Sequence, residues 1–537
     1  MADRSIDKLA DRAATLAGAW GARARASTTL GQERALLRLF GVTGLDRSGR
    51  PLAGAAVDRW LTSAADGLGG GIALPFAMAL TEYDLEPQQL ALDVASGAID
   101  LALEAELLRE PDRRATAVAE ARRLVDAAIE RIDADRVARR ELVDLLGEVS
   151  RPWLGTTLAA PDVDEALDEA AALASAGYDL LRVEVPIGRE LADRMQSAGV
   201  EPPEWRPGDR RRRSEAIDFD DTDPAPSGSQ RALARLRRAA DGVAAQRRGY
   251  VRLGTAIPPL GVPEGAVVAA YERVDLVEAD PVAEIVVGGV DPDRSLADHA
   301  FARRLHRRAD TFVSIGPGPL VVAPDLVSGV PSDPATRSGR ALALQLLGVA
   351  LARADGLSAG RIVVGAYPAW LADEASAVAR ILAEVDVRRS LFPDHIIRFD
   401  EPVGTGLAAG TSASWPYIVA AALARTGSTA LLMRRRLPDM AHAAADARAA
   451  ARVAADVAGV SSRRALHGIA DDHAKAMVAA AEATIDRLSD LGWRAVVGDP
   501  PRAVGRTRDG RAPWAIGGDA IAERTEAFDA LAAFEMD

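Results

Sequence analysis

The segment that follows Pro152 repeats one pattern, in which a short apolar strand precedes an amphipathic helix. The pattern predicts eight strands, at residues 153–159, 179–186, 250–257, 274–278, 310–316, 361–367, 395–401 and 429–434. A helical segment with apolar residues at three- and four-residue spacing follows each strand. Eight such units favour an α/β fold of the (β/α)8 TIM-barrel type, because an open doubly wound sheet usually has fewer strands. The doubly wound sheet remains the alternative, although no GxGxxG follows the first strand.

The segments on either side of this repeat have a different pattern. Stretches such as LADRAATLAGAW and QERALLRLFG predict helices before the first strand. One clear helix, at 473–488, precedes a tail rich in Gly, Pro and Arg, which we expect to pack against the barrel or a partner. We therefore predict an N-terminal helical domain (1–150), a barrel (151–458) and a C-terminal helix and tail (459–537).

Composition excludes several classes of function. No apolar run approaches the ~18–20 residues of a membrane span, and MADRSIDKLADRAA lacks the regions of a signal peptide, so we expect a cytoplasmic protein. The net charge of −13 disfavours nucleic-acid binding, and the basic run 210–213 lies near acidic 218–221, which is typical of a solvated, self-pairing loop. The chain has no cysteine, which excludes disulfides, thiolate nucleophiles and cysteine-bound metals.

Lysine and histidine usage limits the chemistry further. Lys8 and Lys475 are the only lysines, so 63 of the 65 basic residues are arginine. A Schiff base would need one of these two lysines or a lysine from another chain. The histidines show no HxH or HExxH spacing, so we predict no histidine-based metal site, and we expect core or solvent-facing roles for His299 and His306.

The carboxyl ends of barrel strands are where barrel enzymes place their active sites. We expect a substrate- or cofactor-binding cluster there, although a structural ion pair is an equal alternative for any single residue, and we assign no catalytic residue. The candidates are Arg182, Glu184, Arg189 and Glu190 at the second strand, Arg252 and Thr255 in the third, Glu278 and Asp280 at the fourth, Ser314 in the fifth, and Asp400 and Glu401 at the seventh.

Two loops are candidate anion sites. In RVEVPIGRE, Pro186 and Gly188 predict a turn after the second strand, where Arg189 could donate to an anionic group and Glu190 could pair with it. The alternative is that both residues begin the next helix as a solvated pair. After the seventh strand, GTGLAAGTSAS begins with Gly404, Thr405 and Gly406 and could bind a phosphate through backbone N–H groups. A flexible loop explains its glycines nearly as well.

Several stretches resemble the barrel subunit of D-lysine 5,6-aminomutase and its relative D-ornithine 4,5-aminomutase. TTLGQERALLRLFGVTGLD with PLAGAAVD resembles that family's amino-terminal segment, and YVRLGTAIPPLGVPEGAVVAAYERVDLVEAD is the closest barrel match. The resemblance continues through Arg294, Asp298, Phe301 and Arg303, and it covers the helical domain and most of the barrel.

The resemblance implies adenosylcobalamin and pyridoxal phosphate (PLP) at the carboxyl mouth. It also implies a separate small, Rossmann-like subunit that carries the Asp-x-His-x-x-Gly cobalamin motif and the Schiff-base lysine. This chain fits that division, because it has no such motif and no barrel lysine: the nearest string, Asp471 with His473, has Ala476 in place of the glycine.

The chain departs from the family at the PLP site. Residues that contact or flank the cofactor in the family correspond here to Val185, Glu190, Pro258, Ala283, Gly288 and Gly318. A phosphate beside Glu190 without a compensating arginine would meet like-charge repulsion. Either Arg182, Arg189 and Arg252 have taken over, or PLP is not bound as in the family.

Three functions remain open. The first is an aminomutase-like isomerase that moves an amino group on a basic amino acid by a radical mechanism, in a hetero-oligomer with a cobalamin-binding partner. The second is a cobalamin-dependent mutase of another substrate that works without PLP. The third is a non-catalytic barrel that stabilises or regulates a partner.

Overall fold

The eight strands close into a barrel. The computed structural model describes residues 2–64, 67–148, 152–158, 163–184, 227–286, 289–316, 333–366, 377–400, 430–434, 464–493, 517–518, 520–525 and 532–535. All barrel strands are parallel and follow one another in chain order, with the last pairing to the first. They are β2 (Trp153–Thr157), β3 (Leu180–Glu184), β4 (Arg252–Ala256), β5 (Leu276–Glu278), β6 (Phe312–Ile315), β7 (Ile362–Ala366), β8 (Ile396–Asp400) and β9 (Ala430–Arg434). The TIM-barrel prediction is confirmed, and each strand lies within its predicted range.

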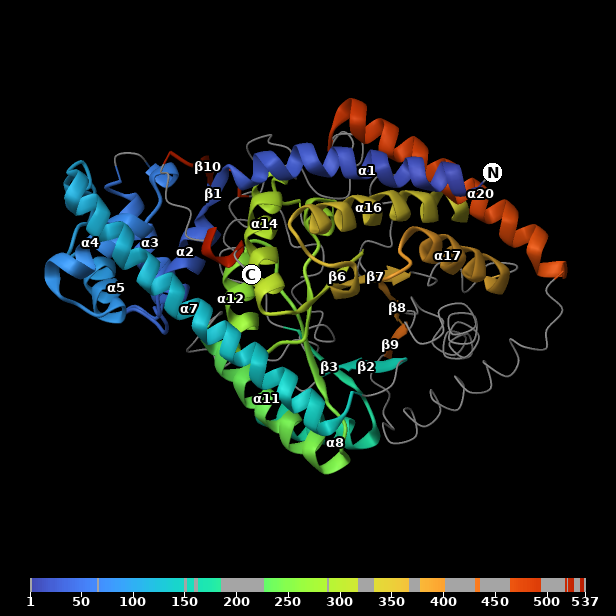
Figure 1. Cartoon of the computed structure of the whole chain (residues 1–537), viewed down its shortest axis with the longest axis horizontal. Coiled ribbons are helices and arrows are strands. Elements are labelled where there is room, and N and C mark those ends of the chain that lie inside the picture. The colour runs from blue at the N-terminus through green and yellow to red at the C-terminus, as the bar shows by residue number, and fades with distance from the viewer. Residues whose placement is uncertain are drawn as a thin grey trace.

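Helices form the outer layer of the barrel (Figure 1). They are α8 (Val163–Ala176), α11 (Ser227–Arg247), α12 (Val262–Tyr271), α13 (Pro281–Val286), α14 (Pro292–Arg308), α16 (Pro334–Ala354) and α17 (Ala377–Leu391). Outward side chains such as Leu253 and Val277 pack against this layer in the main apolar core. No helix in the described part of the chain is long and apolar enough to cross a membrane.

The amino-terminal helices lie beside and along the barrel. They are α1 (Ala2–Arg25), α2 (Leu30–Leu39), α3 (Leu52–Leu61), α4 (Ala73–Tyr83), α5 (Pro87–Ser96), α6 (Leu101–Leu107) and α7 (Pro111–Leu146). Figure 1 shows α2 to α5 gathered at one end of the molecule, while the long α7 runs from there toward α11 and α8. α1 instead packs on α14, α16 and α20 (Arg464–Leu491). The division into three domains stays a prediction.

The chain's two terminal segments meet. β1 (Ser27–Thr29) pairs antiparallel with β10 (Ile521–Glu523). Arg294 of α14 donates to the backbone oxygen of Ala520 at 3.1 Å. The described part of the tail therefore packs on the amino-terminal segment and on a barrel helix.

The barrel interior is apolar on the amino-terminal side of the strands. The inward side chains form a cluster separate from the main core, made of Trp153, Leu180, Leu276, Phe312, Val363, Ile396, Leu431 and Met433. Gly155 lies among them, and a Cβ atom there would overlap the sulfur of Met433. The glycine leaves the space that this methionine fills, so the barrel is a packed core and not a pore.

Gly339 sets the distance between α16 and α20. A Cβ atom on Gly339 would overlap the backbone oxygen of Met477 and lie 2.9 Å from the backbone nitrogen of Ala481. We expect Gly339→Ala to lower the free energy of unfolding by about 1–3 kcal/mol, because the two helices must separate. Chemical denaturation measures this change.

Gly242 in the interior of α11 is the matched control, since a Cβ atom there meets nothing within 4 Å. Gly242→Ala should be neutral or stabilising by about 0.5–1 kcal/mol, because alanine favours a helix interior. Equal effects of the two substitutions would contradict the packing account.

Candidate functional site

Charged side chains line the barrel interior above the apolar cluster. Successive side chains of a strand point to opposite faces, so residues two apart share a face. Leu180, Leu276 and Ile396 face inward within the apolar cluster. Two residues further along β3, β5 and β8, toward the carboxyl ends, the inward positions are Arg182, Glu278 and Arg398.

These side chains form one connected set of contacts. Arg182 Nε lies 2.8 Å from Glu278 Oε1, and Arg398 Nη1 donates to the same oxygen. Arg398 Nε and Nη2 donate to Asp400 Oδ1 at 2.9 and 2.6 Å. Arg182 Nη1 donates to the Thr157 hydroxyl at 3.1 Å, and Arg398 Nη1 lies 3.5 Å from that of Ser314. We call this set the ionic layer: Thr157, Arg182, Glu278, Ser314, Arg398 and Asp400.

The charges within the ionic layer compensate one another. Burial raises the pKa of Glu278, but the guanidinium groups of Arg182 and Arg398 outweigh burial and hold this pKa below its ordinary value. Two arginines face two carboxylates. The described layer therefore has no net charge when Glu278 and Asp400 are ionised.

The structure brings together four of the predicted site residues, Arg182, Glu278, Ser314 and Asp400. Arg398, which joins them, was not among the predicted residues. The available signal was its spacing, because Arg398 lies two residues before Asp400 on β8 and so shares its inward face.

Two candidates lie behind the strands. Thr255 pairs with Val183 and Val277, which belong to the outer core, and its hydroxyl donates to the backbone oxygen of Val183 at 3.2 Å. Its side chain therefore faces the helical layer. Asp280 accepts backbone N–H groups of Val282 at 2.9 Å and Gly316 at 3.0 Å, so it joins the start of α13 to the end of β6. Neither residue belongs to the ionic layer, and their binding roles stay predictions.

Arg252 is the first residue of β4 and lies at the opposite, amino-terminal end of the barrel. Its guanidinium stacks on the ring of Trp153 at 3.7 Å, and Nη2 lies 3.1 Å from Glu148 Oε1. Arg252 points to the barrel interior like the mouth residues, but it lies at the other end of its strand. Arg252 therefore cannot replace a phosphate ligand at the mouth.

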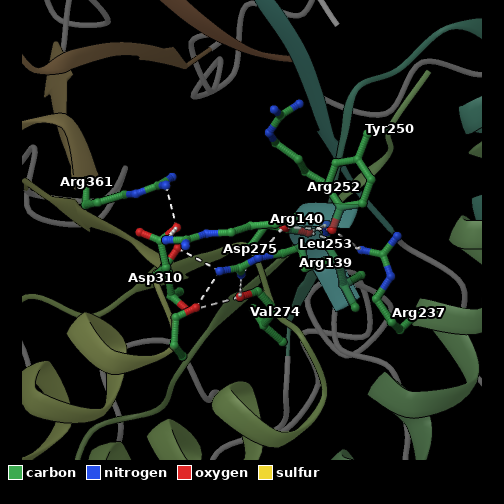
Figure 2. A network of polar contacts seen from close by, with 12 residues as sticks. Arg139, Arg140, Arg237, Tyr250, Arg252, Leu253, Val274, Asp275, Asp310 and Arg361 are labelled. Atoms are coloured by element: carbon green, nitrogen blue, oxygen red, sulfur yellow. Dashed lines mark hydrogen bonds and ion pairs between the residues drawn. The ribbon is translucent and has the colours of Figure 1, made fainter. Parts of the chain in front are cut away.

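A polar network surrounds this amino-terminal end (Figure 2). Asp275 accepts the backbone N–H of Leu253 at 2.8 Å, the Tyr250 hydroxyl at 2.9 Å and Arg237 Nη1 at 3.1 Å. Arg139 of α7 donates to backbone oxygens of Ala309 and Asp310 (Figure 2). These contacts tie strand starts to the surrounding helices.

The remaining candidates lie outside the described residues. Glu184 ends β3, but its side chain is not described. The same holds for the two loop sites and the residue after β8, namely Arg189, Glu190, Glu401, Gly404, Thr405 and Gly406. Their roles stay predictions.

The histidines with described side chains belong to other parts of the fold. His299 and His306 are buried on α14, His395 directly precedes β8, and His473 is buried on α20. Across the described ranges, no group of three histidine, aspartate or glutamate side chains could hold a metal ion.

His306 makes the stability of the fold depend on pH. The side chain is buried and neither ring nitrogen has a hydrogen-bond partner among the described residues. Burial, with further contributions from His299 and Arg303, lowers the pKa of His306 from 6.5 to about 3. Between about pH 6.5 and 3, His306 binds a proton in the unfolded chain but not in the folded chain. The folded state therefore loses stability as the pH falls through this range.

We expect His306→Met to reduce this loss. Relative to neutral pH, the variant should gain on the order of 2 kcal/mol over the natural chain at about pH 5. Denaturant titrations at several pH values measure the difference. Parallel stability profiles for the two proteins would contradict the account.

The described residues do not fit PLP as the family resemblance requires. Pro258 and Ala283, at two of the positions concerned, carry no side-chain donor, and the described arginines of the mouth already face carboxylates. Lys8 and Lys475 are exposed on the outer helices α1 and α20. In the described part of the chain, neither the phosphate nor an aldehyde has its expected partner.

Fold and site define a TIM-barrel protein with a charged layer at the carboxyl mouth of the barrel, the end where barrel enzymes act. The family model described as the D-lysine 5,6-aminomutase TIM-barrel domain of the alpha subunit matches residues 1–198 and 227–406. The chain belongs to this family.

Two curated relatives are similar over part of their length. The chain is 27% identical to the lysine 5,6-aminomutase alpha subunit of Acetoanaerobium sticklandii, over 54% of this chain and 51% of that protein. It is 24% identical to the subunit of the same name from Fusobacterium nucleatum subsp. nucleatum, over 70% of this chain and 66% of that protein. The matched regions thus span about half to two thirds of these relatives.

Among solved structures, dihydropteroate synthase from Anaplasma phagocytophilum with bound 6-hydroxymethylpterin-monophosphate aligns with a TM-score of 0.35 and 11% identity. The alignment covers 57% of this chain and 98% of that chain. A likeness at this level carries no argument about the site.

Proposed function

We propose that the chain is the barrel subunit of an adenosylcobalamin-dependent, aminomutase-like isomerase, which moves an amino group between neighbouring carbons of a basic amino acid. It would act in a hetero-oligomer with a separate, small cobalamin-binding subunit. The family match over most of the chain carries this proposal. Adenosylcobalamin would supply the radical chemistry when bound.

The chain's own residues have two roles in this proposal. The apolar cluster closes the barrel below the mouth, so water and other hydrogen donors do not reach a reacting molecule from that side. The ionic layer above it holds carboxylates on fixed strands, which suits the ammonium groups of a basic amino acid. Binding, orientation and exclusion of water are the tasks of this barrel.

A specific observation favours a second candidate, a cobalamin-dependent mutase that works without PLP. Pro258 and Ala283 provide no phosphate donor, and the described arginines of the mouth are compensated by carboxylates. In this alternative the substrate would contact the ionic layer without an intervening cofactor.

We expect the purified chain alone to bind little cobalamin. The described histidines are buried away from the mouth, and the sequence lacks an Asp-x-His-x-x-Gly motif. Equilibrium dialysis with absorbance spectra measures the binding. Tight binding, with the cobalt coordinated by a histidine of this chain, would contradict the division into two subunits.

The complementary test adds a co-expressed small protein that carries the Asp-x-His-x-x-Gly motif. The reconstituted pair should isomerise a basic amino acid in the presence of adenosylcobalamin, and omission of PLP separates the two candidate functions. Lack of any isomerisation with a cobalamin-loaded partner would favour a non-catalytic barrel.

A further inference from the structure

The two carboxylates of the ionic layer are held by the same arginine, Arg398. Glu278 Oε1 faces both Arg182 and Arg398. Asp400 Oδ1 accepts two N–H groups of Arg398, whereas Oδ2 is buried without a hydrogen-bond partner among the described residues. Asp400 therefore has one open acceptor oxygen beside the paired carboxylate of Glu278.

An unpaired, buried acceptor oxygen favours a ligand that donates hydrogen bonds. A buried carboxylate oxygen without a donor costs free energy, and such oxygens are rare in folded proteins. Arg182 and Arg398 already direct N–H groups at carboxylates, so an arriving anion would have to displace Glu278 or Asp400. A cationic donor instead completes the layer without breaking any of its described contacts.

We propose that Glu278 and Asp400 form a binding site for an ammonium group, and that Arg398 positions both carboxylates. The proposal deepens the function proposed above, because it assigns the ammonium end of the amino-acid substrate to these two carboxylates. Both side chains are partly exposed, 17% for Glu278 and 15% for Asp400.

Arg398 acts through the two carboxylates. It is the most buried charged side chain of the layer, with 5% exposed, and its planar guanidinium reaches Glu278 on β5 and Asp400 on its own strand. A lysine could supply the charge but not this fixed arrangement of donors. Arg398 is therefore a positioning residue, and it helps to keep Glu278 ionised.

The test compares two probes of equal chain length and opposite charge, pentane-1,5-diamine and pentanedioate. Calorimetric titration of the full chain should show binding of the diamine and no comparable binding of the dianion. Glu278→Gln and Asp400→Asn should each weaken diamine binding by about tenfold to a hundredfold, since each removes a charge-assisted hydrogen bond.

Arg252→Gln is the matched control. It also removes a buried arginine from the barrel interior, but at the opposite end. This substitution should lower the melting temperature and leave diamine affinity unchanged. A thermal melt of every variant shows whether it folds. If Glu278→Gln does not fold, the titration of the natural chain with the two probes still tests the proposal, because only the diamine should bind.

The pH dependence of binding tests the role of Arg398. The groups around Glu278 in the described layer are Arg182 from β3, Ser314 from β6, and Arg398 with Asp400 from β8. Without Arg398, only Arg182 opposes the effect of burial, so the pKa of Glu278 should rise. Arg398→Gln should therefore move the pH at which diamine binding is half lost upward. Arg398→Lys should reverse part of that upward shift, because the lysine supplies a positive charge, but it should not restore the full affinity.

Three results would overturn the inference: tighter binding of pentanedioate, no binding of the diamine to the natural chain, or unchanged diamine affinity in a folded Glu278→Gln variant. Because the titration contains no cobalamin, it is independent of isomerase activity. A chain that binds the diamine as expected but never supports isomerisation would contradict the proposed function and leave this inference standing.

Discussion

A charge inside a closed barrel must find its counter-charge on another strand, because all inward side chains share one narrow axis. In this protein Glu278 of β5 meets that constraint by contacting Arg182 of β3 and Arg398 of β8. The apolar cluster fills the axis below these contacts. Along its axis, the barrel interior thus has two layers, an apolar cluster and a neutral ionic layer nearer the carboxyl ends of the strands. The proposed chemistry depends on this arrangement.

Buried polar contacts also attach the outer parts of the molecule to the barrel. Asp298 of α14 accepts Arg294 Nε at 2.7 Å and the Thr29 hydroxyl, and burial raises its pKa to about 6. Arg38 of α2 donates to Glu264 of α12 at 2.7 Å. Such pairs cost desolvation and are strongly destabilising when one partner is removed. They fix how the amino-terminal helices sit on the barrel more specifically than apolar packing alone would.

The sequence was sufficient for the barrel, since apolar strands and amphipathic helices alternate eight times with distinct periods. It was less informative about the site. Thr255 faces outward and Arg252 lies at the amino-terminal end of the barrel, because a strand's register in a barrel depends on its neighbours. Arg398 was missed, although parity with Asp400 places it inward. The polarity of the site depends on which carboxylate oxygens the arginines contact, and only the folded geometry determines that.

The most direct measurement is a crystal structure of the chain with bound pentane-1,5-diamine. The account predicts an ammonium nitrogen within hydrogen-bond distance of Asp400 Oδ2 and of the Glu278 carboxylate, with the contacts of Arg398 to both carboxylates retained. A diamine bound elsewhere, or a mouth in which Arg182 or Arg398 has left its carboxylate to meet another group, would contradict it.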